Sequence, residues 1–90
     1  MKTKTFKIGE RAYYGIWRVE VESEIIRFVG IDWDTKKVKD TKEFRYWKCL
    51  IPSQNYDWIL PIFDYAENIS DYHHAEMMID FVREATGVPK

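Results

Sequence analysis

Two adjacent histidines, His73 and His74, are the residues of this 90-residue chain that first suggest metal binding. Neighbouring residues on a helix point about 100° apart, so adjacent imidazoles cannot easily reach one ion. Helical residues that share a face are three or four positions apart. Because His74 falls among apolar residues, we expect a core or interface histidine with one hydrogen-bonded ring nitrogen. We expect no metal and no other cofactor.

A pair of carboxylates, Asp32 and Asp34, is the second candidate site. Residues two apart on a strand point to the same side, where two carboxylates could bind a cation or act as acid and base. The pair also precedes a polar turn, where aspartate is common because its side chain hydrogen-bonds to nearby backbone. We therefore interpret these residues as part of a turn.

The single cysteine, Cys49, could act as a nucleophile only if an imidazole approached it. A lone cysteine in a strand-like, apolar segment is more typical of a small buried side chain. The chain also has no glycine-rich phosphate loop, no G-x-S-x-G and no C-x-x-C motif. We assign no catalytic residue and expect a non-enzymatic protein, with a small metal-dependent or hydrolytic enzyme as the second alternative.

Basic and aromatic side chains are interleaved in the first half of the chain. Nucleic-acid-binding sheets use this combination, because rings stack on bases while cations contact phosphates. Acidic residues interrupt the pattern, which favours a solvated face over an aromatic core. Nucleic-acid binding is therefore the alternative function rather than the leading one. Its candidate contacts are Trp17, Arg18, Arg45 and Trp47.

Charge is unevenly distributed, although the formal net charge of the whole chain is −1. Residues 1–51 carry 12 Lys and Arg against 8 Asp and Glu, and residues 52–90 carry 2 against 7. This asymmetry predicts a basic sheet side and an acidic helical side. Complementary charges of this kind favour association between two copies of the chain.

Apolar periodicity and turn residues predict the elements that position these side chains. Segments rich in β-branched and aromatic residues, joined by short polar connections, indicate an antiparallel meander. A final amphipathic helix is predicted over residues 71–86, with Ser70 as its N-cap and Gly87 as its C-terminal stop. Residues 56–67 fit either a short, broken helix or a loop. The expected strands are 4–8, 13–21, 25–33 and 43–51, the last with an alternative earlier start at Val38.

These elements make one α+β domain spanning residues 1–90. Its predicted order is a four-stranded antiparallel meander, a short helical or irregular segment, and a C-terminal amphipathic helix packed on the sheet. The N-terminal residues lack the apolar stretch of a signal peptide, and no apolar run approaches the ~20 residues that span a membrane. We expect a cytoplasmic protein with no membrane partner.

Apolar side chains exceed what one helix on one sheet face needs. The apolar arc of the final helix is about 200° wide, so this helix should pack on the sheet and on either residues 56–67 or another subunit. Beneath it we expect Trp17, Val19, Val29, Ile31 and Trp33. We predict a small binding or adaptor module acting through aromatic sheet and helix surfaces, with itself (as a homodimer) or another protein as partner. The candidate interface residues are Tyr14, Ile16, Ile26, Phe28, Met77 and Phe81.

Overall fold

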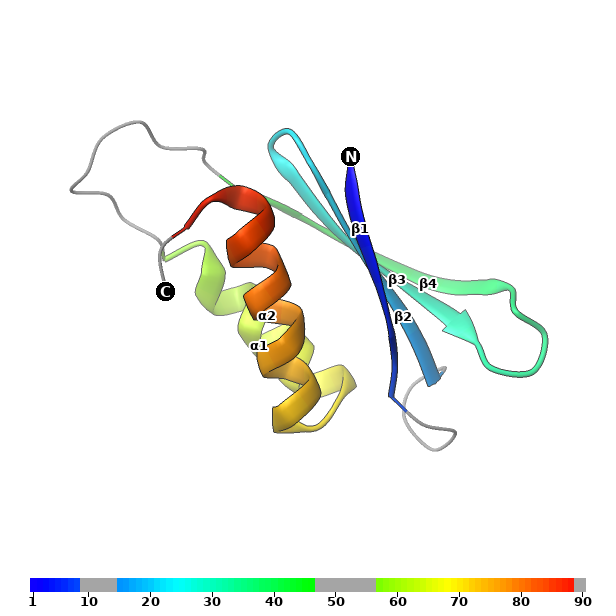
Figure 1. Cartoon of the computed structure of the whole chain (residues 1–90). Helices are drawn as coiled ribbons and strands as arrows, with labels where there is room; N and C mark the ends of the chain where they lie inside the picture. The colour runs from blue at the N-terminus through cyan, green and yellow to red at the C-terminus, as the bar shows by residue number, and fades with distance from the viewer. Residues whose placement is uncertain (9–14, 47–56, 89–90) are drawn as a thin grey trace.

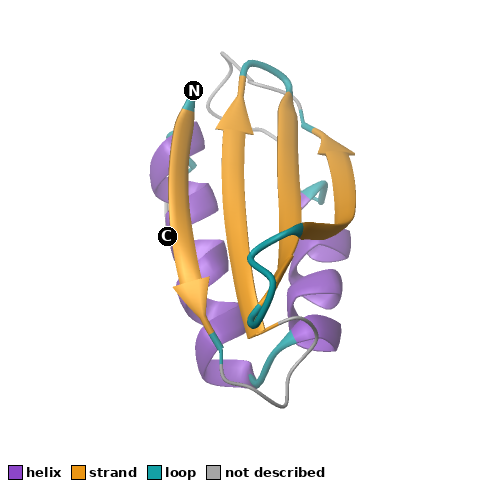
Figure 2. Ribbon diagram, turned by 90° about the vertical axis from the view of Figure 1, so that its right-hand side faces the viewer, coloured by secondary structure: helices purple, strands orange, loops and turns teal. Residues whose placement is uncertain are grey.

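Four strands and two helices form two layers in the computed structural model, which describes residues 1–8, 15–46 and 57–88 (Figure 1). The antiparallel sheet has the order β1-β2-β3-β4, which confirms the predicted α+β meander. Both helices cover one face of the sheet, and the opposite face has no described helix over it (Figure 2). The elements are β1 (Lys2–Lys7), β2 (Gly15–Glu22), β3 (Ile25–Asp32), β4 (Val38–Arg45), α1 (Ile59–Ile69) and α2 (Tyr72–Thr86).

Strand pairing decides which side chains face the helices. Val19 of β2 lies opposite Phe28 of β3, and residues directly opposite each other point to the same face. Both belong to the core between the layers. Alternation along the strands then places the neighbouring core residues on this side as well: Trp17, Val21 and Ile26.

The predicted face assignment is wrong for β3. We expected Val29 and Ile31 beneath the final helix and Phe28 at an interface instead. Phe28 is instead fully buried beneath the helices, and Ile31 is only half-buried on the opposite face. Val29 is buried, but it too lies on that opposite face. Both faces of β3 are apolar, so the hydrogen-bond register between β3 and β2 determines which face is turned toward the helices. A register shift of one residue would exchange the two faces.

Aromatic rings fill the space between the two layers. Tyr65 of α1 contacts Trp17, Phe28 and Phe44 of the sheet, with ring centroids 6.1, 5.4 and 5.7 Å apart. All three contacts are edge-on, the geometry that aromatic pairs favour. These four rings are therefore packed inside the domain and do not form a surface for a partner.

The ambiguous segment after residue 56 contains a continuous helix, α1. Its buried residues Ile59, Ile62, Ala66 and Ile69 recur every three or four positions and form one apolar stripe. Pro61 is tolerated because it lies in the first turn, where a backbone N–H would have no partner within the helix. α2 packs against α1 and against β1 and β2, so its apolar arc faces the sheet and the helix of the preceding segment, which is one of the two arrangements expected.

The ends of α2 agree with the predicted helix except at the N-cap. Asp71, not Ser70, is the N-cap, and its carboxylate accepts a hydrogen bond from the His74 backbone N–H at 2.8 Å. Ser70 instead ends α1, with its hydroxyl donating to the Ala66 carbonyl at 2.7 Å. Gly87 ends α2 in the left-handed region at a φ of 81°, as predicted.

Replacing Asp71 by Ala is expected to lower the free energy of unfolding by about 1 kcal/mol, because the cap of α2 is lost. Asp71→Asn is the control: it retains an acceptor oxygen and should cost less. Urea denaturation followed by circular dichroism measures both values. An Asn variant as destabilised as the Ala variant would contradict the capping role.

Candidate functional site

The two adjacent histidines are not part of a metal-binding cluster in the part of the chain that the structure describes. His74 is half-buried, and its Nδ1 lies 3.0 Å from each carboxylate oxygen of Asp71, so one ring nitrogen has a partner, in agreement with the sequence interpretation. The hydrogen bond from the His74 backbone N–H is the main cause that lowers the pKa of Asp71. Among the residues that the structure describes, no three His, Cys, Asp or Glu side chains are grouped to hold an ion.

The carboxylate of Asp32 belongs to the turn between β3 and β4. It accepts hydrogen bonds from the backbone N–H groups of Asp34 and Thr35, each at 2.9 Å. The bond from Thr35 is the largest cause that lowers the pKa of Asp32. This supports the turn interpretation. β4 then begins at Val38, the earlier of the two starts that the sequence allowed.

The open face of the sheet carries an ion-pair network centred on Glu20. Its carboxylate accepts hydrogen bonds from Arg18 at 2.7 Å and from Arg27 at 2.8 Å. Arg27 also reaches Glu43 of β4 at 3.2 Å, so the network joins three strands. The Glu20 side chain is only 9% exposed. The bond from Arg27 is the largest cause that keeps the pKa of Glu20 below its ordinary value of 4.5.

The candidate nucleic-acid contacts do not form one surface. Trp17 is 1% exposed beneath the helices and cannot stack on a base, so its predicted role is wrong. Arg18 is paired with Glu20 on the open face. Arg45 is exposed at the end of β4, and Trp47 lies outside the described residues. These positions weigh against recognition of a phosphate backbone, because stacking rings and free cations are not brought together.

The candidate interface residues on the sheet are also separated. Ile26 and Phe28 are fully buried in the core beneath the helices, so they cannot line an interface and the prediction is wrong for both. The error follows from the inverted faces of β3. Ile16 lies on the open face but is buried. Tyr14 falls outside the described residues, as does Cys49.

The helix layer exposes the apolar side chains that sequence reasoning missed. Leu60 is 62% exposed and Tyr72 is 59% exposed. The Tyr72 ring contacts the half-buried ring of Phe63 at 6.1 Å, and Phe63 lies one turn after Leu60 on α1. We call Leu60, Phe63 and Tyr72 the helix patch. It was missed because residues 56–67 had no clear periodicity, although Leu60 and Phe63 have helical spacing.

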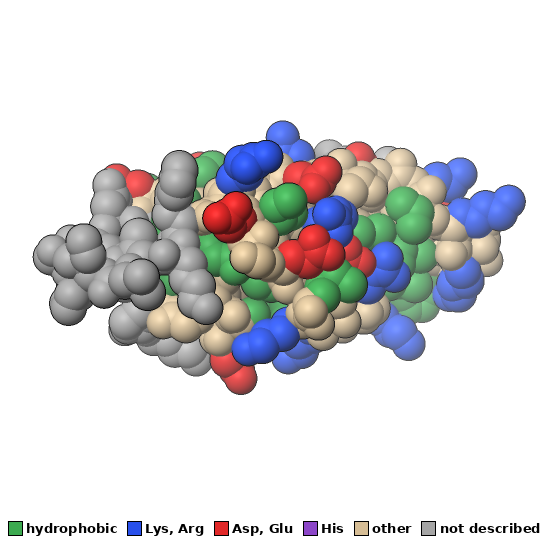
Figure 3. Space-filling model, turned by 90° about the horizontal axis from the view of Figure 1, so that it is seen from above, with side chains coloured by type: hydrophobic (Ala, Val, Ile, Leu, Met, Phe, Trp, Pro, Cys, Tyr) green, Lys and Arg blue, Asp and Glu red, His purple; other side chains and the backbone are tan. Residues whose placement is uncertain are grey.

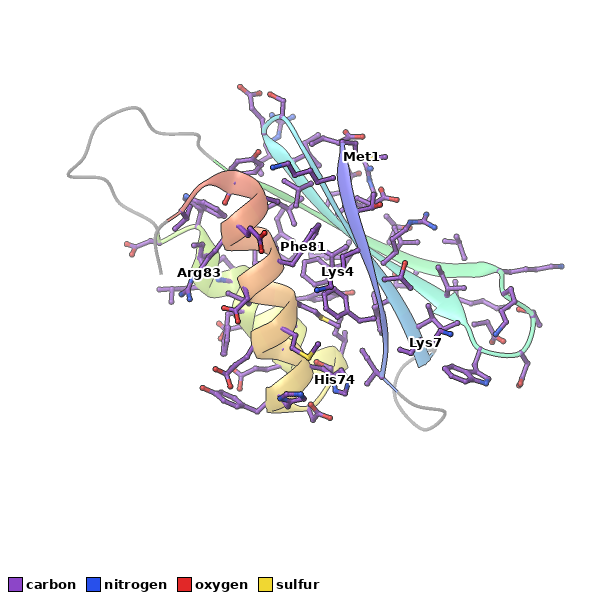
Figure 4. All side chains as sticks on the ribbon, in the orientation of Figure 1. Met1, Lys4, Lys7, His74, Phe81 and Arg83 are labelled. Carbon is purple, nitrogen blue, oxygen red and sulfur yellow. The ribbon has the colours of Figure 1, made fainter. Side chains whose placement is uncertain are left out.

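Two further apolar residues of α2, Met77 and Phe81, were predicted at an interface. Met77 is 38% exposed, and Phe81 is half-buried against the core. They are four residues apart and share a flank of the helix. Figure 4 shows Phe81 on the side of α2 that faces β1.

Charge divides the molecule into two regions. Residues 57–88 carry seven carboxylates and one cationic side chain, Arg83, which gives a formal net charge of −6. The turn between β3 and β4 and the start of β4 carry exposed lysines with Asp34 and Asp40 among them, and Figure 3 shows Lys and Arg side chains at this end of the molecule. The Lys36 ammonium lies 5.0 Å from the centre of the Trp33 ring. We call Trp33, Lys36, Lys37, Val38 and Lys39 the hairpin end.

No helix in the described parts of the chain is both long enough and apolar enough to cross a membrane. No protein-family model, curated protein or solved structure matches this chain.

Proposed function

We propose that this protein is a small non-enzymatic binding module that acts through its helix surface and associates with a second copy of itself. The supporting observation is the separation of charge between the two layers: residues 57–88 have a net charge of −6, whereas the described residues before them carry ten cationic side chains and seven carboxylates, a net charge of +3. The exposed lysines of the hairpin end belong to this second group. Opposite charges on two exposed surfaces of one chain attract between copies. Each surface also exposes apolar area for burial, Tyr72 on the helices and Val38 at the hairpin end.

The charges select among the possible dimers. A two-fold contact from helix patch to helix patch would bring two acidic surfaces together, which opposes binding. The favoured contact places the hairpin end of one copy against the helix patch of the other. Two antiparallel molecules can make this contact twice and close as a dimer, whereas a single open contact would continue as a filament. We propose the closed dimer.

Sedimentation velocity is expected to show a dimer at tens of micromolar protein and about 0.1 M salt, where charges act over about 10 Å. The dimer should dissociate near 1 M salt, because the screening length falls to about 3 Å. A single 10.9 kDa species at both salt concentrations would contradict self-association.

A charge swap tests the proposed contact directly. Lys37→Glu with Lys39→Glu reverses the hairpin end, and Asp64→Lys with Glu67→Lys reverses the neighbourhood of the helix patch. Each double variant alone should weaken association, and mixing the two should restore it, because opposite charges then face each other again. Glu24→Lys, in the exposed turn between β2 and β3, is the control. Folded variants that fail to associate when mixed would contradict this contact.

A further inference from the structure

β1 lies at the edge of the sheet, and part of its backbone faces outward. It pairs with β2 alone among the described strands. The hydrogen bond from the Ile8 N–H to the Gly15 carbonyl, at 2.8 Å, marks a bonded pair of the antiparallel ladder. Bonded and non-bonded pairs alternate, so the even-numbered residues of β1 bond to β2. The outward N–H and C=O groups therefore belong to Thr3, Thr5 and Lys7.

A flank of α2 runs beside this edge on the covered side of the sheet. Lys4 and Phe6 point to this side, because they lie opposite core residues of β2. The Lys4 ammonium lies 5.5 Å from the centre of the Phe6 ring. Figure 4 shows Lys4 and Phe81 between β1 and α2, and Met77 precedes Phe81 by one turn. We call β1 with Met77 and Phe81 the β1 edge.

The charges of β1 indicate which strand could join it. β1 carries three lysines, Lys2, Lys4 and Lys7, and no carboxylate. Pairing with the β1 of a second copy would bring lysines together, which destabilises a strand pair and protects edges from self-association. A strand with carboxylates opposite Lys2 and Lys4 would have the opposite effect.

We propose that the β1 edge binds an extended acidic segment of another protein, which adds as a fifth, antiparallel strand. Main-chain hydrogen bonds to Thr3, Thr5 and Lys7 supply affinity, as in other strand-addition complexes. Carboxylates opposite Lys2 and Lys4 supply selectivity, as does an apolar side chain opposite the buried Phe6 that contacts the exposed part of Met77. This site is separate from the helix patch and the hairpin end, and it does not depend on the proposed dimer.

The probe is the acetylated, amidated peptide Thr-Leu-Thr-Glu-Thr-Glu-Thr, titrated into ¹⁵N-labelled protein. In antiparallel register its leucine lies opposite Phe6, and its glutamates lie opposite Lys4 and Lys2. Its first three threonines then bond to the outward groups of Lys7, Thr5 and Thr3. We expect saturable shifts that are largest at these three amides.

N-methylated peptides provide the matched controls. Methyl groups on the first three threonine nitrogens remove the three hydrogen bonds that the peptide donates to β1 and place methyl groups against the edge, and they should weaken binding at least about tenfold. Methyl groups on the leucine and glutamate nitrogens point away from β1 and should change affinity by less than about twofold. Equal losses of affinity for the two methylation patterns would overturn the proposal. So would the absence of saturable amide shifts at Thr3, Thr5 and Lys7 up to about 1 mM peptide.

Charge reversal separates this site from the proposed dimer. The double variant Lys2→Glu with Lys4→Glu should lose the acidic peptide and bind one in which lysines replace both glutamates. The same variant should keep the sedimentation behaviour of the unmodified protein, because neither lysine belongs to the hairpin end. Tight binding of the acidic peptide to the double variant would overturn the assignment to β1.

Discussion

Replacing Phe28 by Ala is expected to lower the free energy of unfolding by about 3–5 kcal/mol. Phe28 is fully buried, and its ring packs edge-on against Phe44 and Tyr65 at 6.0 and 5.4 Å. Truncation removes this buried area and leaves a cavity between the sheet and α1. Domains of this size have a total stability of roughly 5–13 kcal/mol, so the loss is a large fraction of the whole.

Ile31→Ala is the control for Phe28→Ala within the same strand. Ile31 is half-buried on the open face, opposite Val38 of β4, so its truncation leaves no closed cavity. We expect a loss below about 2 kcal/mol. Urea denaturation gives the free energy of unfolding of both variants and so compares truncation on the two faces of β3. A loss for Ile31→Ala as large as that for Phe28→Ala would show that these faces are wrongly assigned.

Replacing Glu20 by Gln is expected to cost about 1–3 kcal/mol near neutral pH. The carboxylate accepts charge-assisted bonds from Arg18 and Arg27, and a neutral amide replaces it with weaker bonds. The two guanidinium groups are partly exposed, which keeps the loss below that of a fully buried ion pair. Glu24→Gln, in the exposed turn, is the control and should change stability by less than about 0.5 kcal/mol.

The contribution of Glu20 to the free energy of unfolding should decrease as the pH is lowered. The pKa of its carboxyl group is lowered in the folded protein from 4.5, mainly by the bond from Arg27. A lowered folded-state pKa contributes stability above the unfolded-state pKa, and this stability is lost as the pH falls through the folded-state pKa. The stability difference between the unmodified protein and Glu20→Gln should therefore be constant above about pH 5.5 and decrease toward about pH 3. A difference that grows on acidification would contradict this role.

Short-range patterns in the sequence were sufficient for the order of the elements. Alternating apolar residues separated by polar turns predicted the meander, and a helical stripe ending at Gly87 predicted α2. These signals are local, because strand alternation, turn formation and helix capping each depend on residues a few positions apart. The segment around Pro61 was less clear, because a proline fits a first turn and a loop equally well.

The candidate surfaces depended on contacts between distant residues. Residue types predicted an acidic helical side. The exposed helix patch depends in addition on the orientation of α1, which buries Ile59, Ile62 and Ala66. The outward groups of the β1 edge likewise follow from the pairing of β1 with β2. Neither property can be read from one element alone.

The sequence by itself determined that this is an α+β chain with a basic first half and an acidic second half. Only the tertiary structure decided that Phe28 faces the helices while Ile31 faces outward, and that Trp17 is covered rather than exposed. The physical reason is that β3 is apolar on both sides. Its orientation is therefore set by its hydrogen-bond register with β2 and by the burial of Phe28 against Tyr65, which lies far along the chain.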